Sequence, residues 1–305
     1  MDAEIIRKNG ETYSFEDYGV LVKDFIVSSI PVESTFGEME GRDGRIDKGA
    51  RFGNREIRIP FSMKAYDLLD FPLLRDVLFE LVTTKESFYL REKRRPKKLA
   101  YKFVDTTESP QMDESTNNRY IGGKRYLVRL QNSIEIEQVG LYGDEELIFE
   151  TTELPYAESI GTSQNIQENG IDANDELWGF GMGLIADDDS LIYTHTGTSF
   201  RIYNPGNVKV HPFQQELKIT ISDVQGSTEY LQLRNTTNGD TFRVTEAVSN
   251  SQTIVLDGAN VTSNGLAFLR STNRQFISLV PGWNEFQVTG ATSARVAFDF
   301  RFYYH

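Results

Sequence analysis

Cysteine is absent from this chain of 305 residues, and histidine occurs only three times. Without cysteine, the chain can form no disulfide, no thiolate nucleophile and no cysteine-ligated zinc site. The histidines, His195, His211 and His305, are not paired at the spacing of a metal-binding motif. The sequence therefore predicts no metal site and no cofactor.

Long apolar runs are also lacking. No stretch of about 18 apolar residues occurs, which is the length that a membrane-spanning helix requires. Residues 1–8 carry charges where a secretory signal would place its apolar core. We therefore expect the protein to be made in a cytoplasm and to act there or after release from the cell.

Positive charge is scarce, because 32 lysines and arginines face 45 aspartates and glutamates, giving a net charge of −13. A general nucleic-acid binder must neutralise phosphates, and a protein held on anionic lipid needs basic clusters. The composition therefore predicts no sequence-specific nucleic-acid partner and no membrane partner. It suits a soluble component that is assembled after synthesis.

Catalytic motifs are missing as well. The chain has neither the phosphate-binding loop Gly-x-x-x-x-Gly-Lys-Ser/Thr nor the nucleophile motif Gly-x-Ser-x-Gly. Residues 179–183, Gly-Phe-Gly-Met-Gly, imitate a nucleotide fingerprint, but the third glycine is misplaced. The acidic run at 187–189 lacks the spaced ligands of a calcium loop. Carboxylates are abundant, yet no acid–base pair stands out, so we expect no catalytic residues and no enzyme.

What is present divides the chain into two parts. Its length suffices for two cores, and 39% hydrophobic and 25% charged residues are typical of ordinary folded domains. Strand patterns of the first part end near Pro155, and residues 157–190 are rich in Gly, Asn, Asp and Gln with little periodicity. We predict domains at 1–156 and 157–305, with a linker and an irregular beginning in the second.

The first part contains a long, charged, Gly-rich segment between two strands. Residues 20–27 are rich in β-branched side chains, and residues 57–63 alternate apolar and polar side chains, both typical of strands. Pro60 indicates an edge or a bulge in the second strand. Residues 33–53 hold five glycines and charges of both signs. This segment is either a mobile surface loop or an arm, such as a β-hairpin, that reaches a neighbouring subunit.

One amphipathic helix follows. Asp70 suits an N-cap and Pro72 the first turn, while Phe71, Leu74, Leu78 and Leu81 recur at helical spacing. We predict that this helix covers an open sheet. Further strands are predicted at 87–90, 100–104, 126–130, 133–139 and around 147–149. The basic run at 91–98 is interpreted as a solvated hairpin tip or a charged subunit contact rather than a phosphate site.

The second part shows many short strands and no convincing helix, which predicts a β-sandwich. The Asn-Gly pair at 238–239 is a strong hairpin signal between two of these strands. Trp178 and Trp283 are the only tryptophans, and each either fills a core or stacks on a sugar. The predicted strands are 200–203, 217–222, 230–234, 241–245, 253–256, 275–279, 285–288 and 295–302.

These features together resemble a known family. In the first part they are the strand at 20–25, the Gly-Arg-Asp-Gly-Arg-Ile-Asp loop at 41–47, the segment 52–61 and the helix region 66–82. In the second they are Tyr-Asn-Pro-Gly at 203–206, Lys-Ile-Thr-Ile at 218–221 and Leu-Val-Pro-Gly-Trp-Asn at 279–284. The chain resembles the distal tail proteins of long-tailed, non-contractile bacteriophages that infect Gram-positive hosts.

The resemblance implies a mainly β fold. Its first domain would be barrel- or sandwich-like, with one covering helix and a protruding belt loop. The second would be a sandwich like that of galectins or carbohydrate-binding modules. His211 is followed by Pro212 and Phe213, without the arginine partner of a galectin sugar site. We therefore interpret the second domain as a protein-docking module.

The resemblance also implies a structural role without catalysis. The protein would form a homo-hexameric ring around the DNA channel at the distal end of the phage tail in the virion. The ring would join the tail tube, built of the major tail protein, to a tail-tip or tail-associated lysin protein and to receptor-binding or baseplate proteins. Before assembly the protein would reside in the host cytoplasm.

Two sets of candidate residues follow. The alternative function is a carbohydrate-binding adhesin that recognises host cell-wall sugars through the second domain, with Trp178 and Trp283 as sugar contacts. For the ring, we predict subunit contacts by the polar residues of the long segment and its base, namely Glu38, Arg42, Asp43, Arg45, Asp47, Arg51, Asn54 and Arg55.

Overall fold

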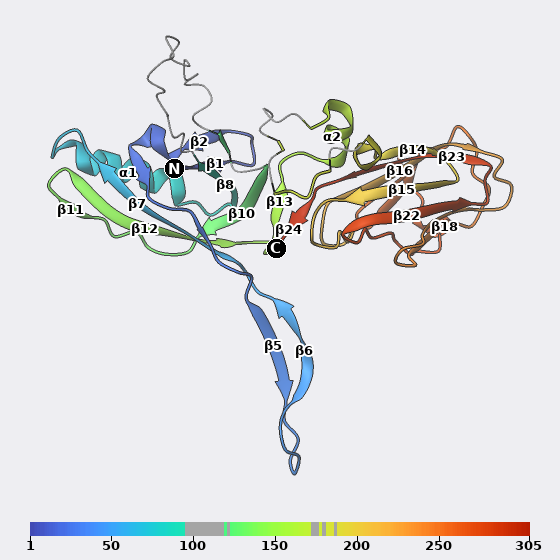
Figure 1. The fold of residues 1–305 in the computed structure, drawn as a ribbon, viewed down its shortest axis with the longest axis horizontal. Coiled ribbons are helices and arrows are strands. Elements are labelled where there is room, and N and C mark those ends of the chain that lie inside the picture. The colour runs from blue at the N-terminus through green and yellow to red at the C-terminus, as the bar shows by residue number, and fades with distance from the viewer. Residues whose placement is uncertain (95–118, 121–122, 172–176, 179–180, 186–187) are drawn as a thin grey trace, which may run out of the picture. The chain divides into compact units, whose positions relative to one another are not determined.

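The computed structural model of the chain describes residues 1–94, 119–120, 123–171, 177–178, 181–185 and 188–305. These residues form two compact units, Met1–Ala157 and Glu158–His305 (Figure 1). The division lies one residue from the domain boundary expected from the sequence. In the described part, no helix is both long and apolar enough to cross a bilayer.

Unit 1 is built on an antiparallel sheet with the strand order β2-β1-β8-β10-β12-β7-β3. The short strand β4 also pairs with β7, while β9 pairs with β8 and β11 with β12. The bounds are β1 Asp2–Ile6, β2 Thr12–Ser14, β3 Val20–Val22, β4 Ile26–Val27, β7 Glu56–Lys64, β8 Phe88–Arg94, β9 Arg119–Tyr120, β10 Lys124–Leu130, β11 Glu137–Val139 and β12 Tyr142–Thr151.

Strand β7 is the centre of this core. Its apolar side chains at positions 57, 59, 61 and 63 are completely buried, which confirms the alternation predicted from the sequence. The edge position suggested by Pro60 is wrong, since β7 lies between β12 and the β3–β4 side. A bulge is present opposite Pro60, but its extra residue lies on the β3–β4 side and not in β7, because the register shifts by one between the pairs Val22–Phe61 and Ile26–Arg58.

This bulge divides the single strand predicted at 20–27 into β3 and β4. The Pro60 carbonyl accepts a hydrogen bond from the Lys23 amide, at 2.8 Å. In a strand, the N–H and C=O of one residue point to the same neighbour, so the amide hydrogen that proline lacks would also face this side. The ladder is interrupted where proline cannot contribute to it, and Phe25 turns its side chain into the core.

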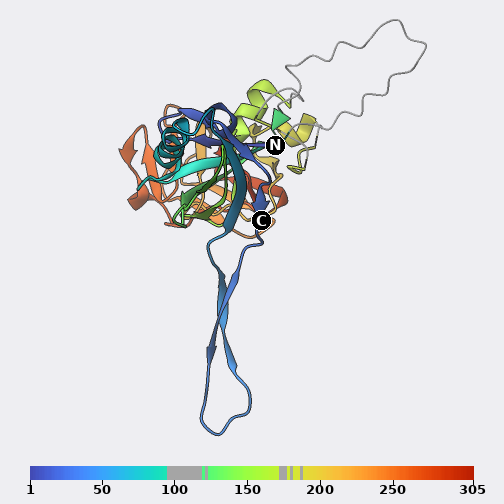
Figure 2. The same cartoon turned by 90° about the vertical axis from the view of Figure 1, so that its left-hand side faces the viewer.

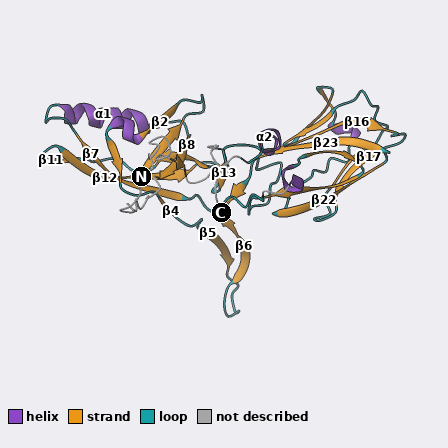
Figure 3. Cartoon of the chain, turned by 45° about the horizontal axis from the view of Figure 1, so that its top comes forward, coloured by secondary structure: helices purple, strands orange, loops and turns teal. Residues whose placement is uncertain are grey.

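The predicted helix is α1, Asp70–Val82, and it lies over one side of the sheet (Figure 3). Phe71, Leu78 and Leu81 are buried and Leu74 packs against the same core, which confirms the predicted stripe. The predicted cap is wrong. Leu69 occupies the N-cap position. The carboxylate of Asp67 accepts hydrogen bonds from the amides of residues 69 and 70, at 2.8 and 2.9 Å.

Two other predictions for unit 1 need correction. Only 137–139 of the strand predicted at 133–139 form a strand, while Ile134 and Ile136 pack against the core from a connection. The beginning of the basic run is not a hairpin tip but belongs to β8. There Arg91 is 4% exposed and lies 3.8 Å from the Glu4 carboxylate. Residues 95–98 and the strand predicted at 100–104 fall outside the described residues.

Unit 2 contains two antiparallel sheets that pack face to face, which confirms the predicted sandwich. Phe286 of one sheet and Phe298 of the other lie 4.9 Å apart between ring centres. The first sheet has the order β14 Thr194–Gly197, β23 Ser293–Phe300, β16 Leu217–Gln225, β19 Ile254–Asp257, β20 Asn260–Ser263 and β21 Leu266–Ala267. The second has β15 Ser199–Asn204, β22 Gly282–Thr289, β17 Leu231–Asn235 and β18 Thr241–Val244.

The connections of unit 2 depart from the sequence prediction in two places. Residues 275–279 form no strand, because only Leu279 makes a bridge, to Val210. Helix α2, Ser163–Asn169, lies in the segment predicted to be an irregular linker, and a capping box between Thr162 and Asn165 begins it. The Asn-Gly hairpin is confirmed, since Gly239 has φ +84° between β17 and β18. The remaining elements are β13 Ala157–Ser159, β24 Tyr303–Tyr304 and the 3-10 turns at 15–18, 188–191 and 269–271.

Candidate subunit interface

A hairpin projects from unit 1 away from its sheet (Figures 1 and 2). It consists of β5, Val32–Gly37, and β6, Ile46–Phe52, which pair with each other and with no other strand in the described part of the chain. We call residues 32–52 the arm. The arm occupies the segment predicted to be either a loop or a hairpin. Two strands alone are marginally stable in water, so an arm of this kind needs further contacts.

Glycine sets the local shape of the arm. The register shifts by one residue between the pairs Ser34–Ala50 and Phe36–Asp47, which places an extra residue on β6. Gly49 takes φ +104° at this bulge, and the Asp47 carboxylate accepts its amide hydrogen at 2.8 Å. A side chain at such a φ is strained, which explains the glycine. Asp47, one of the predicted interface residues, thus stabilises the bulge within its own arm.

The arm has two chemically different faces. Val32 lies opposite Phe52 in the ladder, and Phe36 is on the same side of β5 as Val32 because side chains alternate. These three side chains are 61%, 48% and 50% exposed. The other side carries Glu33 and Arg51, whose charged groups lie 2.7 Å apart. We call the first side the apolar face of the arm.

Most of the predicted interface residues do lie on the arm, and several pair within it. Arg51 bonds Glu33, and Arg45 lies 3.9 Å from Glu38 with both side chains largely in solvent. Exposed ion pairs of this kind contribute little stability. Arg42 and Asp43 are exposed at the tip between β5 and β6. The charged residues are therefore available on the surface, but their pairing within the arm lowers what they can add to a contact.

The last two predicted residues lie at the base of the arm. The amide of Asn54 donates to the Glu150 carboxylate at 2.8 Å. Arg55 is only 5% exposed, and its guanidinium lies 5.9 Å from the ring centre of Tyr126. Burial lowers the pKa of Arg55 and raises that of Tyr126. Contrary to the expectation of an exposed contact, Arg55 packs inside unit 1 and supports the root of the arm.

Sequence reasoning selected charged residues and missed the apolar face. The signal was present in β5, where Val32, Ser34 and Phe36 stand two residues apart. This alternation does not continue through residues 37–53, which are rich in glycine and charge. The bulge at Gly49 breaks the period of two in β6. The exposed apolar side chains, rather than the paired charges, are the strongest feature of the candidate interface.

The two tryptophans proposed as sugar contacts differ in position. Trp178 is 4% exposed, and its ring packs 5.7 Å from Phe302 and against the backbone of Gly161. Contrary to the sugar-contact expectation, it offers no open face. Trp283 is half-buried, with the Arg201 guanidinium 4.1 Å from its ring centre and Tyr203 at 5.0 Å. A salt bridge of 2.8 Å from Asp189 holds Arg201 in that place.

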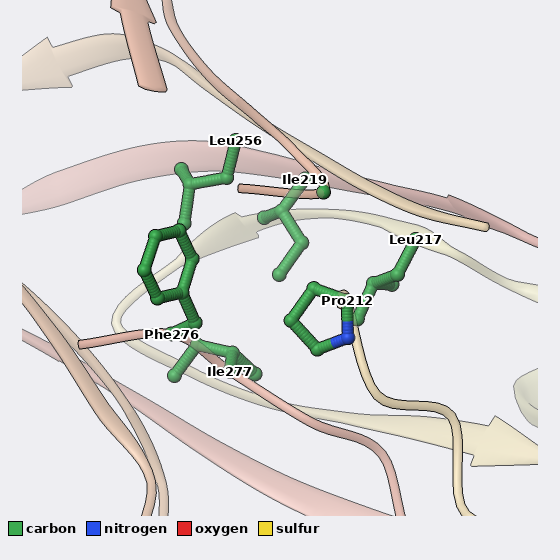
Figure 4. A pocket seen from close by; sticks show the side chains of 7 residues that line it. Pro212, Leu217, Ile219, Leu256, Phe276 and Ile277 are labelled. Atoms are coloured by element: carbon green, nitrogen blue, oxygen red, sulfur yellow. The ribbon is translucent and has the colours of Figure 1, made fainter. Parts of the chain in front are cut away.

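A hollow in the sandwich offers no better sugar site. Figure 4 shows its apolar lining, and the space has no room even for a water molecule. Sugar hydroxyls require hydrogen-bonding partners, which such a lining does not supply. The side chains that surround it are Pro212, Leu217, Ile219, Leu256, Phe276 and Ile277.

Comparisons with known proteins agree with this fold. Residues 8–150 match the family model described as a phage tail protein RIFT-related domain, whereas the curated proteins give no match. The solved Dit protein of phage SPP1, described as a paradigm of the hub adsorption apparatus in phages infecting Gram-positive bacteria, is similar over 98% of this chain and 99% of its own. The TM-score is 0.60 at 12% identity, which shows a shared fold.

Two structures of the phage p2 baseplate in its activated conformation, with strontium and with calcium, are more distant. Their identity is 10% and their TM-scores are 0.38 and 0.37, with coverage of 98% and 99% of this chain and 97% of each matched chain. The family match in unit 1 and the fold of the whole chain lead to one conclusion: residues 8–150 are similar to the phage tail protein RIFT-related domain, and the chain has the fold of the solved Dit protein.

Proposed function

We propose that this protein is the structural hub at the distal end of a phage tail. Six copies close into a ring that surrounds the DNA channel, and each copy contacts its neighbour through the arm. The protein has a mechanical role and no catalytic one. The observation that carries the proposal is the projecting arm, whose apolar face leaves Val32 61% and Phe36 50% exposed to solvent.

The arm suits a ring for a physical reason. Closed rings repeat one heterologous interface, in which a surface of one copy meets a different surface of the next. A projecting element supplies such an interface, since one arm per copy serves every contact in the ring. Its apolar face loses water only when a neighbour covers it, so association stabilises both the interface and the hairpin.

The shared fold also supports a proposed position in the tail. The fold shared with a protein described as a hub of the adsorption apparatus supports a place between the tail tube and the tail tip. Unit 1 would contact the tube, built of the major tail protein. Unit 2 would dock a tail-tip or tail-associated lysin protein and receptor-binding or baseplate proteins. The protein would be made in the host cytoplasm and then incorporated in the virion.

Carbohydrate binding is the alternative function, and the structure supports it less well. Of the two tryptophans, only Trp283 retains access to solvent, and Arg201 occupies the space over its ring. A sugar would have to displace a guanidinium that Asp189 holds by a salt bridge. The sandwich therefore suits protein docking better than sugar stacking.

The proposal is tested by shortening the arm in register. Ser34 and Ala50 are a directly opposed pair, so joining them through Asn-Gly removes the tip and Phe36 but closes a regular hairpin. The unaltered chain should form rings in electron micrographs and in light scattering at high concentration or with tube protein. The shortened chain should remain monomeric with the same circular dichroism spectrum.

Replacement of Val139 by Ser is a matched control, because Val139 is 70% exposed but lies on β11, outside the arm. This variant should assemble as the parent does. Rings that form normally from the shortened chain would contradict the role of the arm. A parent chain that stays monomeric under every condition, with and without tube protein, would contradict the ring itself.

A further inference from the structure

Helix α1 is apolar on two sides, although only one side covers the core. Leu69, at the N-cap, is 85% exposed, Leu73 is 65% and Val77 is 38% exposed. These residues are four apart, so they form one row along the helix surface. Tyr66 and Leu68, just before the helix, are 91% and 61% exposed. We call these five residues the α1 ridge.

The α1 ridge is not required by the fold of unit 1. Phe71, Leu78, Leu81 and Val82 already fill the core side of the helix. A surface helix normally presents polar residues to water. A contiguous exposed apolar patch on one element marks an interaction site.

We propose that the α1 ridge of one copy receives the apolar face of the arm from the neighbouring copy. This inference rests on the proposed ring and names the second half of its interface. A heterologous contact needs two different surfaces on each copy. In the described part of unit 1, the large exposed apolar side chains gather on the arm and on the α1 ridge, and the others are Leu21, Val139 and Tyr142.

The two surfaces match in length. Val32 and Phe36 are four residues apart on β5, which corresponds to about 13 Å at 3.3 Å per residue. Leu69 and Val77 are eight residues apart along α1, which corresponds to about 12 Å at 1.5 Å per residue. The apolar face of the arm can therefore lie along the ridge with its outermost side chains over the ends of the row.

Charge supports the same pairing. Asp70 lies three residues before Leu73 and Glu80 three residues after Val77, so carboxylates stand at both ends of this row. On the arm, Arg45 lies 5.8 Å from the ring centre of Phe36, and its nearest carboxylate is at 3.9 Å. Seating Phe36 on the ridge brings this guanidinium towards an acidic border.

The natural absence of cysteine gives a direct test by cross-linking. One preparation carries Phe36→Cys and a second carries Leu73→Cys, and the two are mixed under assembling conditions with a short bismaleimide. A dimer containing one chain of each kind can form only between copies. Leu21→Cys is the matched control for the ridge, since Leu21 is 64% exposed on β3 of the same unit.

The expected result is a mixed dimer of the Phe36→Cys and Leu73→Cys chains, at least tenfold more abundant than that of the Phe36→Cys and Leu21→Cys chains. Separately, Leu73→Asp should weaken self-association tenfold or more, whereas Leu21→Asp should not change it. Circular dichroism and the melting temperature verify that each variant is folded.

The possible negative results distinguish an error about the α1 ridge from an error about the ring. Rings that form while Phe36→Cys cross-links Leu21→Cys as well as Leu73→Cys, or neither, would overturn the ridge as the receiving surface and leave the proposed function standing. Rings unaffected by Leu73→Asp would do the same. A parent chain that never associates would overturn the ring and the ridge together.

Discussion

The replacement Phe36→Ser tests the energetic basis of the interface with a single side chain. Phe36 lies on the apolar face of the arm and is not part of the core of unit 1 as far as the structure describes the chain. The Arg45 guanidinium of the same arm lies 5.8 Å from its ring centre. The free energy of unfolding of the monomer should therefore change by no more than about 0.5 kcal/mol, which is the usual range for surface substitutions. Any larger effect should appear only in association.

The expected loss of association free energy follows from the exposed surface of the phenyl group of Phe36. Complete burial of a phenylalanine contributes roughly 1.5–3 kcal/mol, and Phe36 is already half-buried. Covering the remaining half contributes about 1 kcal/mol for each interface, or a factor of roughly five in the dissociation constant. A closed ring of six copies repeats this loss at every contact, so ring formation falls by roughly 10⁴-fold overall.

Mass photometry across a concentration series measures this effect. The parent and Val139→Ser should show the same midpoint for ring formation, and Phe36→Ser should require a several-fold higher concentration. An unchanged midpoint for Phe36→Ser would refute the assignment of the apolar face to the interface. A lowered monomer melting temperature would instead refute the view that Phe36 has no role in the fold of unit 1.

Three further changes test the units themselves. Leu78→Ala should destabilise unit 1 by about 2–5 kcal/mol in calorimetry, because Leu78 is fully buried beneath α1. His195→Phe should flatten the pH dependence of the unit 2 melting temperature. Burial lowers the pKa of His195, so the unfolded chain binds the extra proton and the parent loses stability as the pH falls below about 6.5. A glycan array should give the same background signal for the parent and for Trp283→Ala.

Much of the fold could be predicted from the sequence in elements that have a regular apolar period and bury only one side. The alternation from Ile57 to Met63 has all its apolar members in the core, and the helical stripe of Phe71, Leu78 and Leu81 also lies there. Period and burial coincide in these elements because each packs on one side only. The sandwich strands of unit 2 follow the same rule, as Leu217, Ile219 and Ile221 show.

The errors arose where tertiary contacts decide the outcome. Arg55 looks like an exposed contact from its charge, yet the ring of Tyr126, far away in sequence, covers it. Trp178 lies among glycine and polar residues but packs on Phe302 at the other end of its unit. Ile134 alternates as in a strand, although it reaches the core from a connection. No local pattern carries this information, because the covering residues are distant.

The same limit applied to the candidate interface, where sequence reasoning could find the arm but not its faces. Glycines, charges and the length of the segment pointed to a projecting element. Which side chains share a side depends on the register, and the bulge at Gly49 changes the register. The charged residues therefore looked like the contact, although Glu33–Arg51 and Glu38–Arg45 pair within the arm.

This distinction makes a prediction about salt. The arm, residues 32–52, holds five acidic and four basic residues, so nearly all of the net charge of −13 lies elsewhere in the chain. Copies brought into a ring therefore repel one another, and salt screens that repulsion. An apolar contact does not depend on unscreened charges. We expect rings to form at lower protein concentration in about 500 mM than in about 20 mM sodium chloride.

If salt instead weakened ring formation, the interface would be stabilised mainly by ion pairs. If Arg42, Arg45 and Arg51 bonded carboxylates of the neighbour, screening would weaken each contact, and rings would dissociate as salt is added. Light scattering at the two salt concentrations separates these cases without any substitution. Combined with Phe36→Ser, the measurement is decisive: loss of Phe36 must shift the midpoint at both salt concentrations if the apolar face holds the ring together, and at neither if the charges do.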